Sequence, residues 1–279
     1  MIFNMEFKSN FGKTIAWAIV LIVLLGLLMA FYPFLAEPQM NSLFGSMLNA
    51  FNDSTKEILG FTKSTDITNI GDYLSVVYHY LAVLIFIFAM QLGANSLSKE
   101  QNTGNIEYIY SNPISKSEIV TAKLSANIVL YLIFLAIMAI ATYGFVFIIA
   151  ASGVNSKFIP DITDFEVFQA LIKIFVSLLG SGLVFMSFGF LLSAMSKTSE
   201  HQDAISALFV FLIVLVTIIG KTIGSTFANI VSFFPNVAFA TYSFINSDIN
   251  IVAVGVNIAL FVLFVVFTYT IYSHKELKY

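Results

Sequence analysis

The sequence contains no cysteine and no arginine, and only three of its 279 residues are histidine. Without cysteine, the chain forms no disulfide, thiolate metal site, iron–sulfur site or S-acyl anchor. The three histidines, His79, His201 and His274, show no paired spacing, so we predict no metal site. Without arginine, no guanidinium group is present to bind a phosphate or carboxylate through two hydrogen bonds.

Charge of either sign is also scarce. Only 10% of the residues are charged, whereas soluble domains carry about 25%. This shortage excludes a cytosolic enzyme, a nucleic-acid-binding protein and a disordered protein. The chain is instead rich in hydrophobic residues (58%) and aromatic residues (15%), and its mean hydropathy is +0.90. These values indicate an integral membrane protein with lipid as its surroundings.

Long apolar runs predict the spans. A hydrocarbon core about 30 Å thick requires roughly 20 apolar residues in a helix. Six runs qualify, and they cover residues 14–36, 73–97, 124–151, 174–195, 204–220 and 251–272. We therefore predict an all-α membrane protein in which residues 1–279 form a single transmembrane domain with six transmembrane helices.

Six spans place both termini on one side of the membrane. If that side is the cytoplasm, eight lysines and seven acidic residues lie inside, and five lysines and nine acidic residues lie outside. An excess of lysine on the cytoplasmic side is the usual arrangement in membrane proteins. We therefore expect a multi-pass protein of the bacterial cell (plasma) membrane with both termini in the cytoplasm.

Residues 225–250 are too apolar for an ordinary loop and too interrupted for a span. Two short apolar stretches, residues 227–234 and 237–245, meet at Pro235 and Asn236. Neither stretch is long enough to cross the bilayer, so we predict a re-entrant helical pair before the last span. The alternative is a surface loop with two interfacial helices.

Two further segments have helical amphipathic patterns. Phe3, Phe7 and Phe11 share one helix face, which predicts an N-terminal interfacial helix over residues 1–13. In the first outer loop, apolar residues recur with helical spacing from Met40 to Phe51, followed by a possible capping box at residues 54–57. That apolar face either packs on neighbouring spans or contacts an apolar substrate, and the pattern leaves both readings open.

The most polar segment of the chain, residues 98–123, lies between the second and third spans. Gly104 interrupts the preceding helix, and Pro113 ends any helix over residues 105–111 because its ring excludes α geometry in the preceding residue. Ser115 and Glu118 have the spacing of a capping box that restarts a helix. We predict a short transverse helix, displayed to the cytoplasm, on which a partner protein can push.

At these positions the sequence resembles the permease subunits of ABC-2 type exporters. Ten positions match the family signature: Glu100, Gly104, Glu107, Pro113, Ile114, Ser115, Lys116, Glu118, Ile119 and Lys123. The family's Gly-Thr order is inverted here, as Thr103-Gly104. The resemblance extends over essentially the whole chain, through the N-terminal helix, the six spans, the cytoplasmic loop and the broken pair before the last span.

The resemblance implies a permease, not an enzyme, that dimerises with a second copy or a paralogue and binds a cytoplasmic ABC ATPase. No phosphate-binding GxxxxGK[ST] motif occurs in the chain, so ATP and magnesium belong to the partner. The short helix after the second span is then the cytoplasmic coupling helix. The implied coupling residues are Glu100, Gly104, Glu107, Tyr108, Pro113, Ser115, Lys116, Glu118 and Lys123. For Glu100 and Glu107 the alternative is ordinary solvated loop charge.

Polar side chains on the second span suggest a route for the cargo. Tyr73, Tyr80, Gln91 and Asn95 recur near one helical face; they line a pathway or form interhelical hydrogen bonds, and both readings remain open. No charged residue lies in the middle of a predicted span, which favours an external energy source and a hydrophobic or amphipathic cargo. Antimicrobial or secreted peptides, drugs and lipids all fit. The alternative is a stand-alone secondary carrier or channel.

Overall fold

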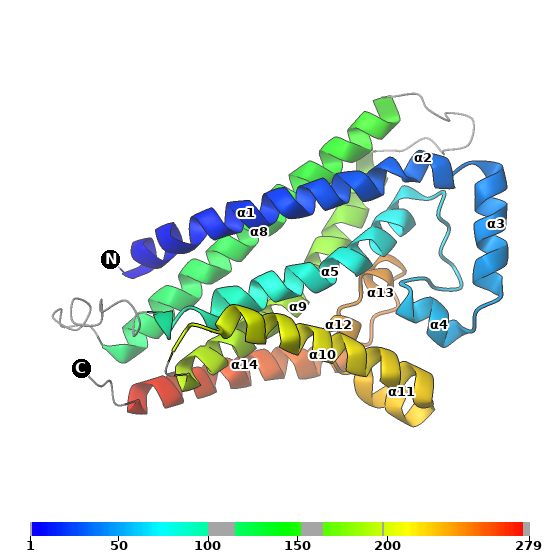
Figure 1. The fold of residues 1–279 in the computed structure, drawn as a ribbon. Coiled ribbons are helices and arrows are strands. Elements are labelled where there is room, and N and C mark those ends of the chain that lie inside the picture. The colour runs from blue at the N-terminus through cyan, green and yellow to red at the C-terminus, as the bar shows by residue number, and fades with distance from the viewer. Residues whose placement is uncertain (1, 100–114, 152–163, 197, 276–279) are drawn as a thin grey trace.

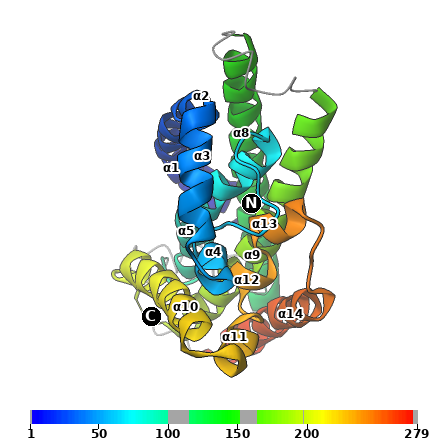
Figure 2. The same cartoon turned by 90° about the vertical axis from the view of Figure 1, so that its right-hand side faces the viewer.

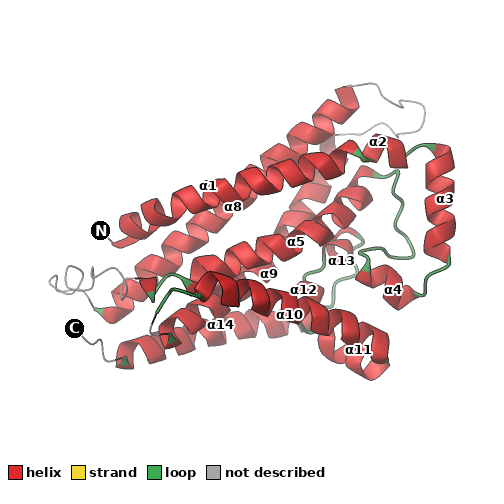
Figure 3. Ribbon diagram, in the orientation of Figure 1, coloured by secondary structure: helices red, strands yellow, loops and turns green. Residues whose placement is uncertain are grey.

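The computed structural model describes residues 2–99, 115–151, 164–196 and 198–275. Every regular element in these ranges is a helix, as Figure 3 shows. Six helices are long and apolar enough to cross a membrane. They are α1 (Ile2–Ala30), α5 (Ile70–Ala94), α8 (Lys116–Ala151), α9 (Asp164–Met195), α10 (Gln202–Ile223) and α14 (Ile251–His274). The structure thus confirms the all-α prediction and the six predicted spans.

The six helices run between two ends of one bundle (Figure 1). We call the end that holds the start of α1 and the end of α14 the terminal end, and the opposite one the distal end. The segment between α5 and α8 leaves and re-enters the bundle at the terminal end, because α5 ends there and α8 begins there.

Helices α5 and α9 pack against each other at the centre of the bundle. Their backbones touch at two glycines: a Cβ atom added to Gly93 would lie 2.1 Å from the carbonyl oxygen of Met186, and one added to Gly189 would lie 2.3 Å from that of Met90. Small residues allow such close helix packing in membranes. This contact makes α5 the most buried of the six spans.

The first helix differs from the prediction. The expected interfacial helix over residues 1–13 is not a separate element, because α1 is unbroken from Ile2 to Ala30. Phe3, Phe7 and Phe11 do stack along it, with ring centroids 6.1 and 5.7 Å apart. Glu6, on another face of the helix, is buried among polar partners in the bundle. These contacts hold the first turns of α1 in line with the rest of the span.

A bent pair of helical segments precedes the last span. It joins α11 (Ser225–Val231) to α12 (Pro235–Ala238) and α13 (Thr241–Ile245), and its two arms meet at 88°. Pro235 takes the first position of α12, where a missing N–H is tolerated. Asn257 of α14 donates to the Phe233 carbonyl at 2.9 Å and so satisfies the backbone at the bend.

Three short helices cover part of the distal end: α2 (Tyr32–Leu35), α3 (Pro38–Asn49) and α4 (Asp53–Ile58). Viewed from that end in Figure 2, α3 runs across the bundle. The capping box expected at residues 54–57 is wrong by two positions. Asn52 caps α4 instead, and its side chain accepts from the Thr55 N–H at 2.8 Å.

Candidate functional site

The predicted coupling segment lies only partly within the described structure. Five of its residues, Glu100, Gly104, Glu107, Tyr108 and Pro113, fall outside the described ranges, and so does the helix predicted over residues 105–111. Ser115, Lys116, Glu118 and Lys123 are described. The structure therefore shows how the two borders of the segment are held.

A reciprocal cap fixes the border at α8. The Ser115 N–H donates to Glu118 Oε2 at 3.0 Å, and the Glu118 N–H donates to Ser115 Oγ at 3.2 Å. This is the predicted capping box, and it satisfies two backbone donors at the start of the helix. Both side chains are therefore engaged in building the helix terminus.

The border at α5 is held by α9. Ser193 Oγ accepts hydrogen bonds from the N–H groups of Leu97 at 2.8 Å and Ser98 at 3.0 Å. The backbone that leaves α5 is thus attached to the neighbouring span. Both ends of the loop therefore join the rigid helices of the bundle.

Two lysines join the end of α14 to this region. Lys116 Nζ donates to the carbonyls of Ser273 at 3.1 Å and Lys275 at 2.9 Å, and a cation there is favoured by the helix dipole. Lys275 Nζ in turn donates to the Ser196 carbonyl at 2.5 Å. Burial lowers the pKa of the Lys275 amine. Lys116 therefore joins the start of α8 to the end of α14.

Lys123 is completely buried, and its carboxylate partner comes from the first helix. Its Nζ lies 3.6 Å from Glu6 Oε2 and donates to the Ser96 carbonyl at 2.5 Å. The exposed fractions of the two side chains are 0% for Lys123 and 4% for Glu6. The pair is shielded from water and joins α1, α8 and the segment after α5.

Two asparagines complete this cluster. Asn10 Nδ2 donates to Glu6 Oε1 at 2.8 Å and to Asn127 Oδ1 at 2.9 Å, and Asn127 Nδ2 donates to Ser96 Oγ at 3.1 Å. We call Glu6, Asn10, Ser96, Lys123 and Asn127 the terminal-end network. The buried partners of Lys123 were not predicted from the sequence. The only signal was polar spacing of four residues, Glu6 to Asn10 and Lys123 to Asn127, which places each pair on one helix face.

The four residues predicted on one face of the second span do not form a common site. Gln91 Nε2 donates to the Asp203 carbonyl at 3.3 Å, and Asn95 Nδ2 donates to Asp203 Oδ1 at 2.7 Å. Lys13 Nζ donates to the same carboxylate oxygen at 2.7 Å. These two amides therefore tie α5 to α10 near the terminal end.

Tyr73 and Tyr80 lie at the other end of α5 and line an apolar cavity of about 340 Å³. Their hydroxyls donate to the carbonyls of Leu28 at 2.5 Å and Leu59 at 3.0 Å, so their polar tips are satisfied. The other lining residues come from α1 to α5 and the segments between them: Leu28, Phe31, Leu35, Phe44, Met47, Leu48, Leu59, Phe61, Ile67, Val76 and Val77. The cavity is suited to a hydrocarbon group.

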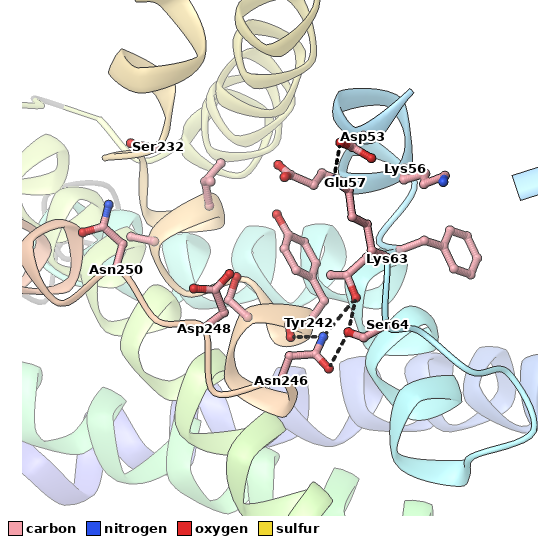
Figure 4. A pocket seen from close by; sticks show the side chains of 15 residues that line it. Asp53, Lys56, Glu57, Lys63, Ser64, Ser232, Tyr242, Asn246, Asp248 and Asn250 are labelled. Atoms are coloured by element: carbon pink, nitrogen blue, oxygen red, sulfur yellow. Dashed lines mark hydrogen bonds and ion pairs between the residues drawn. The ribbon is translucent and has the colours of Figure 1, made fainter. Parts of the chain in front are cut away.

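A polar cavity of about 520 Å³ adjoins the apolar one, and Phe61 lines both. Figure 4 shows Glu57 pointing from α4 toward Tyr242 of α13, while Lys56 points away. Lys221 Nζ of α10 donates to Glu57 Oε2 at 2.9 Å and to the Tyr242 hydroxyl at 3.1 Å. Asp53 and Asp248 add two more carboxylates to the wall. The cavity is suited to a polar or charged group.

Helix α4 contributes Asp53, Lys56 and Glu57 to the polar cavity and is fixed to the spans. The His79 ring lies 3.0 Å from the Ile58 carbonyl oxygen. Gly60 adopts φ +82°, and a Cβ atom there would lie 2.8 Å from the His79 ring. Only glycine combines that backbone angle with that close approach. Helix α4 is therefore held in place by His79 of α5 as well as by Lys221 of α10.

A family model described as ABC-2 family transporter protein matches residues 1–277. The chain belongs to this family. It is thus the transmembrane subunit of an ABC-2 type transporter. No curated protein matches the sequence significantly. ABC-2 permeases generally pair with a separate ABC ATPase that binds the ATP.

Within the described ranges, no cluster of three or more acidic or histidine side chains is arranged to hold a metal. Polar side chains gather at each end of the bundle. The terminal-end network surrounds the borders of the coupling segment, and the paired cavities occupy the distal end. Helix α1 runs from the terminal end to the distal end and so connects the two regions (Figure 1).

Proposed function

We propose that this chain is the permease subunit of an ATP-driven exporter, and that it moves an amphipathic substrate out of a bacterial cell. The observation that carries the cargo class is the pair of adjoining cavities. One is apolar and the other polar, and both are lined by Phe61. A molecule with a hydrocarbon part and a polar part matches both at once.

The cavities also bear on how the cargo meets the protein. Large apolar side chains at the rim of the apolar cavity, including Phe31 and Met47, are exposed. We propose that these side chains contact lipid and that the cavity opens to the bilayer, because large exposed apolar surfaces mark sites of membrane or protein contact. A lipid, a drug or an antimicrobial or secreted peptide reaches it with its hydrophobic part first, and the polar part then enters beside Glu57.

We infer that energy enters at the terminal end, which faces the cytoplasm. A partner ABC ATPase binds the segment of residues 98–123 and supplies ATP and magnesium. Glu100, Gly104, Glu107, Tyr108 and Pro113 are proposed to meet the partner. The supporting observation is that both borders of the segment are fixed to spans, so a push on the loop moves helices. A second permease copy or paralogue completes the transporter.

The lysine distribution supports this orientation, because the terminal side then holds more lysines than the distal side. On this basis the bent pair α11–α13 is a re-entrant segment that enters the membrane from outside. Its arms are too short to span singly, and Asn257 pairs with its backbone at the bend. Backbone of this kind is tolerated in a bilayer only when it is buried in protein or lines a wet cavity.

The stand-alone carrier or channel now has less support. It rested on the polar face of the second span, and half of that face is engaged with Asp203. Flux through liposomes that contain only this chain discriminates between the two functions. The exporter needs its ATPase for any flux, whereas a carrier or channel does not.

The proposal is tested by recovering the partner ATPase from native membranes with the tagged permease. Glu107→Gln and Pro113→Ala are compared with Gln101→Ala, a control in the same loop. We expect the first two variants to lose co-purification or ATPase stimulation and the control to retain both. Unchanged binding and stimulation in all three variants would contradict the proposed coupling.

A further inference from the structure

The terminal-end network contains an ion pair that the stability of the bundle does not explain. Lys123 and Glu6 are almost fully buried, and the removal of two charges from water is costly. Apolar residues of similar volume are often as stabilising as a buried ion pair, or more so. Retention of the charges at this position therefore calls for a role other than stability.

The position of the pair indicates that role. Lys123 is the last residue of the predicted coupling segment, and its amine holds the Ser96 carbonyl just before that segment begins. Asn127, one turn further along α8, donates to Ser96 Oγ. One buried cluster thus joins both borders of the loop. A displacement of either border moves groups that contact Glu6.

The first turns of α1 are the part of the bundle that such a displacement would move. Glu6 and Asn10 lie on α1, and no break follows them before Ala30. At 1.5 Å per residue the 29 residues of α1 extend roughly 43 Å. Figure 1 shows α1 running beside α8 from the terminal end to the distal end. A continuous helix transmits a shift of one end to the other.

The far end of α1 forms part of the cargo cavity. Leu28 lines the apolar cavity, and its carbonyl accepts from the Tyr73 hydroxyl at 2.5 Å. Tyr32, in the next helix, donates to the Thr68 carbonyl at 2.6 Å. A displacement of α1 therefore changes the wall of the cavity and its connection to the start of α5.

We propose that the Glu6–Lys123 pair is the joint through which the coupling segment drives α1, so that both are positioning residues for transport. This inference rests on the proposed function, because it requires an ATPase at the coupling segment. The attraction between the two charges keeps α1 attached to the loop borders as they move. The Asn10 and Asn127 amides donate hydrogen bonds to Glu6 Oε1 and so set the geometry of the pair.

The test uses variants that separate a joint from a structural pair. Glu6→Gln or Lys123→Met alone leaves one buried charge of the Glu6–Lys123 pair without the other and destabilises the protein for that reason. The double variant Glu6→Gln/Lys123→Met leaves none, and Glu6→Lys/Lys123→Glu restores a pair in reverse. Lys8→Gln, an exposed change on the same helix, is the control. Each permease is purified with its ATPase and reconstituted in liposomes of phosphatidylethanolamine and phosphatidylglycerol.

Thermal unfolding, ATPase retention and Mg-ATP-driven movement of a fluorescent lysophospholipid are measured for each variant. For the neutral double variant we expect wild-type unfolding and wild-type ATPase retention, with transport reduced about tenfold, a typical allosteric coupling factor. The reversed pair recovers part of that loss. Wild-type transport by the neutral double variant overturns the inference, and so does a loss that merely follows reduced stability.

A distance measurement provides a readout that a merely structural pair would not change. The absence of cysteine allows spin labels at Leu27→Cys on α1 and Ile223→Cys on α10, both exposed near the distal end. We expect Mg-ATP with vanadate to shift the distance between the labels in the wild-type background and not in the neutral double variant. Equal shifts in both overturn the inference. Failure of the wild type to retain any ATPase overturns the proposed function and this inference together.

Discussion

At the scale of single residues, the absence of a side chain is what holds the centre of the bundle together. Gly93 and Gly189 each face the backbone of the opposite helix, which cannot move aside as a flexible side chain can. Small residues such as these recur in membrane helix contacts. Which glycines are used depends on the tertiary pairing of α5 with α9.

Gly189→Ala is expected to destabilise the protein. The new Cβ atom would lie 2.3 Å from the Met90 carbonyl oxygen, so α5 and α9 must separate, at a cost of about 1–3 kcal/mol. Gly144→Ala is the matched control, because nothing lies within 4 Å of its Cβ position. Unfolding in mixed detergent micelles measures both free energies. Equal effects in the two variants would contradict the proposed packing.

A second residue-scale prediction concerns pH. The hydrogen bond from Lys63 lowers the pKa of the exposed Asp53 carboxyl below its ordinary value. A lowered folded-state pKa adds stability above the unfolded pKa, and that contribution is lost as the pH falls through the folded pKa. In Lys63→Met we expect the pKa of Asp53 to rise toward 3.8, as measured by carboxyl carbon NMR. An exposed pair contributes little, so the unfolding temperature at neutral pH should not change.

At the scale of elements, local patterns predicted what depends on neighbours in sequence. The cap of Ser115 with Glu118 involves residues three apart, and the pattern predicted both partners. The continuation of α1 through Glu6 could not be predicted, because its partners lie in the segment after α5 and in α8, some 90 and 120 residues away. For the same reason the sequence identified Gln91 and Asn95 as a polar pair but not their partner Asp203.

Helix α3 shows how one element presents two faces. Met47 lines the apolar cavity, whereas Leu43, one turn earlier, does not line it and is 64% exposed. Met47→Trp is expected to fill the cavity mouth and to reduce lysophospholipid-stimulated ATPase activity several-fold. Leu43→Trp adds the same bulk toward lipid and should leave that activity unchanged. Similar activities for the two variants would argue that the cavity is not used by the cargo.

At the scale of the whole molecule, the bundle has two different ends. Lysine excess and the borders of the coupling segment mark the terminal end, and the two cavities mark the distal end. Composition was enough to predict the helical class and the number of spans, because both follow from length and apolar content. It was not enough to predict the cavities, which arise where α3 and α4 pack over the spans.

Sidedness is directly testable, because the chain has no natural cysteine. A membrane-impermeant maleimide applied to intact cells should label Lys63→Cys, which is highly exposed at the distal end. Lys8→Cys, exposed at the terminal end, should react only after the cells are permeabilised. The reverse pattern would place the coupling segment outside the cell and exclude an intracellular ATPase.

The magnesium requirement gives a further whole-molecule prediction. Since ATP is proposed to bind the partner ATPase, chelation of magnesium with EDTA should stop transport in liposomes that contain the complete transporter. The same treatment should leave the thermal unfolding of the isolated permease unchanged. Persistent transport without magnesium would favour the stand-alone carrier.

The one residue shared by the walls of the two cavities has a consequence for how such a protein diversifies. Phe61 contributes to the walls of both compartments, so a change in its bulk alters the shape offered to a passenger molecule. The terminal-end network, on which we propose that the partner ATPase acts, lies at the other end of α1. Under the proposed function, a substitution of Phe61 changes which cargo fits the cavities and leaves the residues of the terminal-end network unchanged.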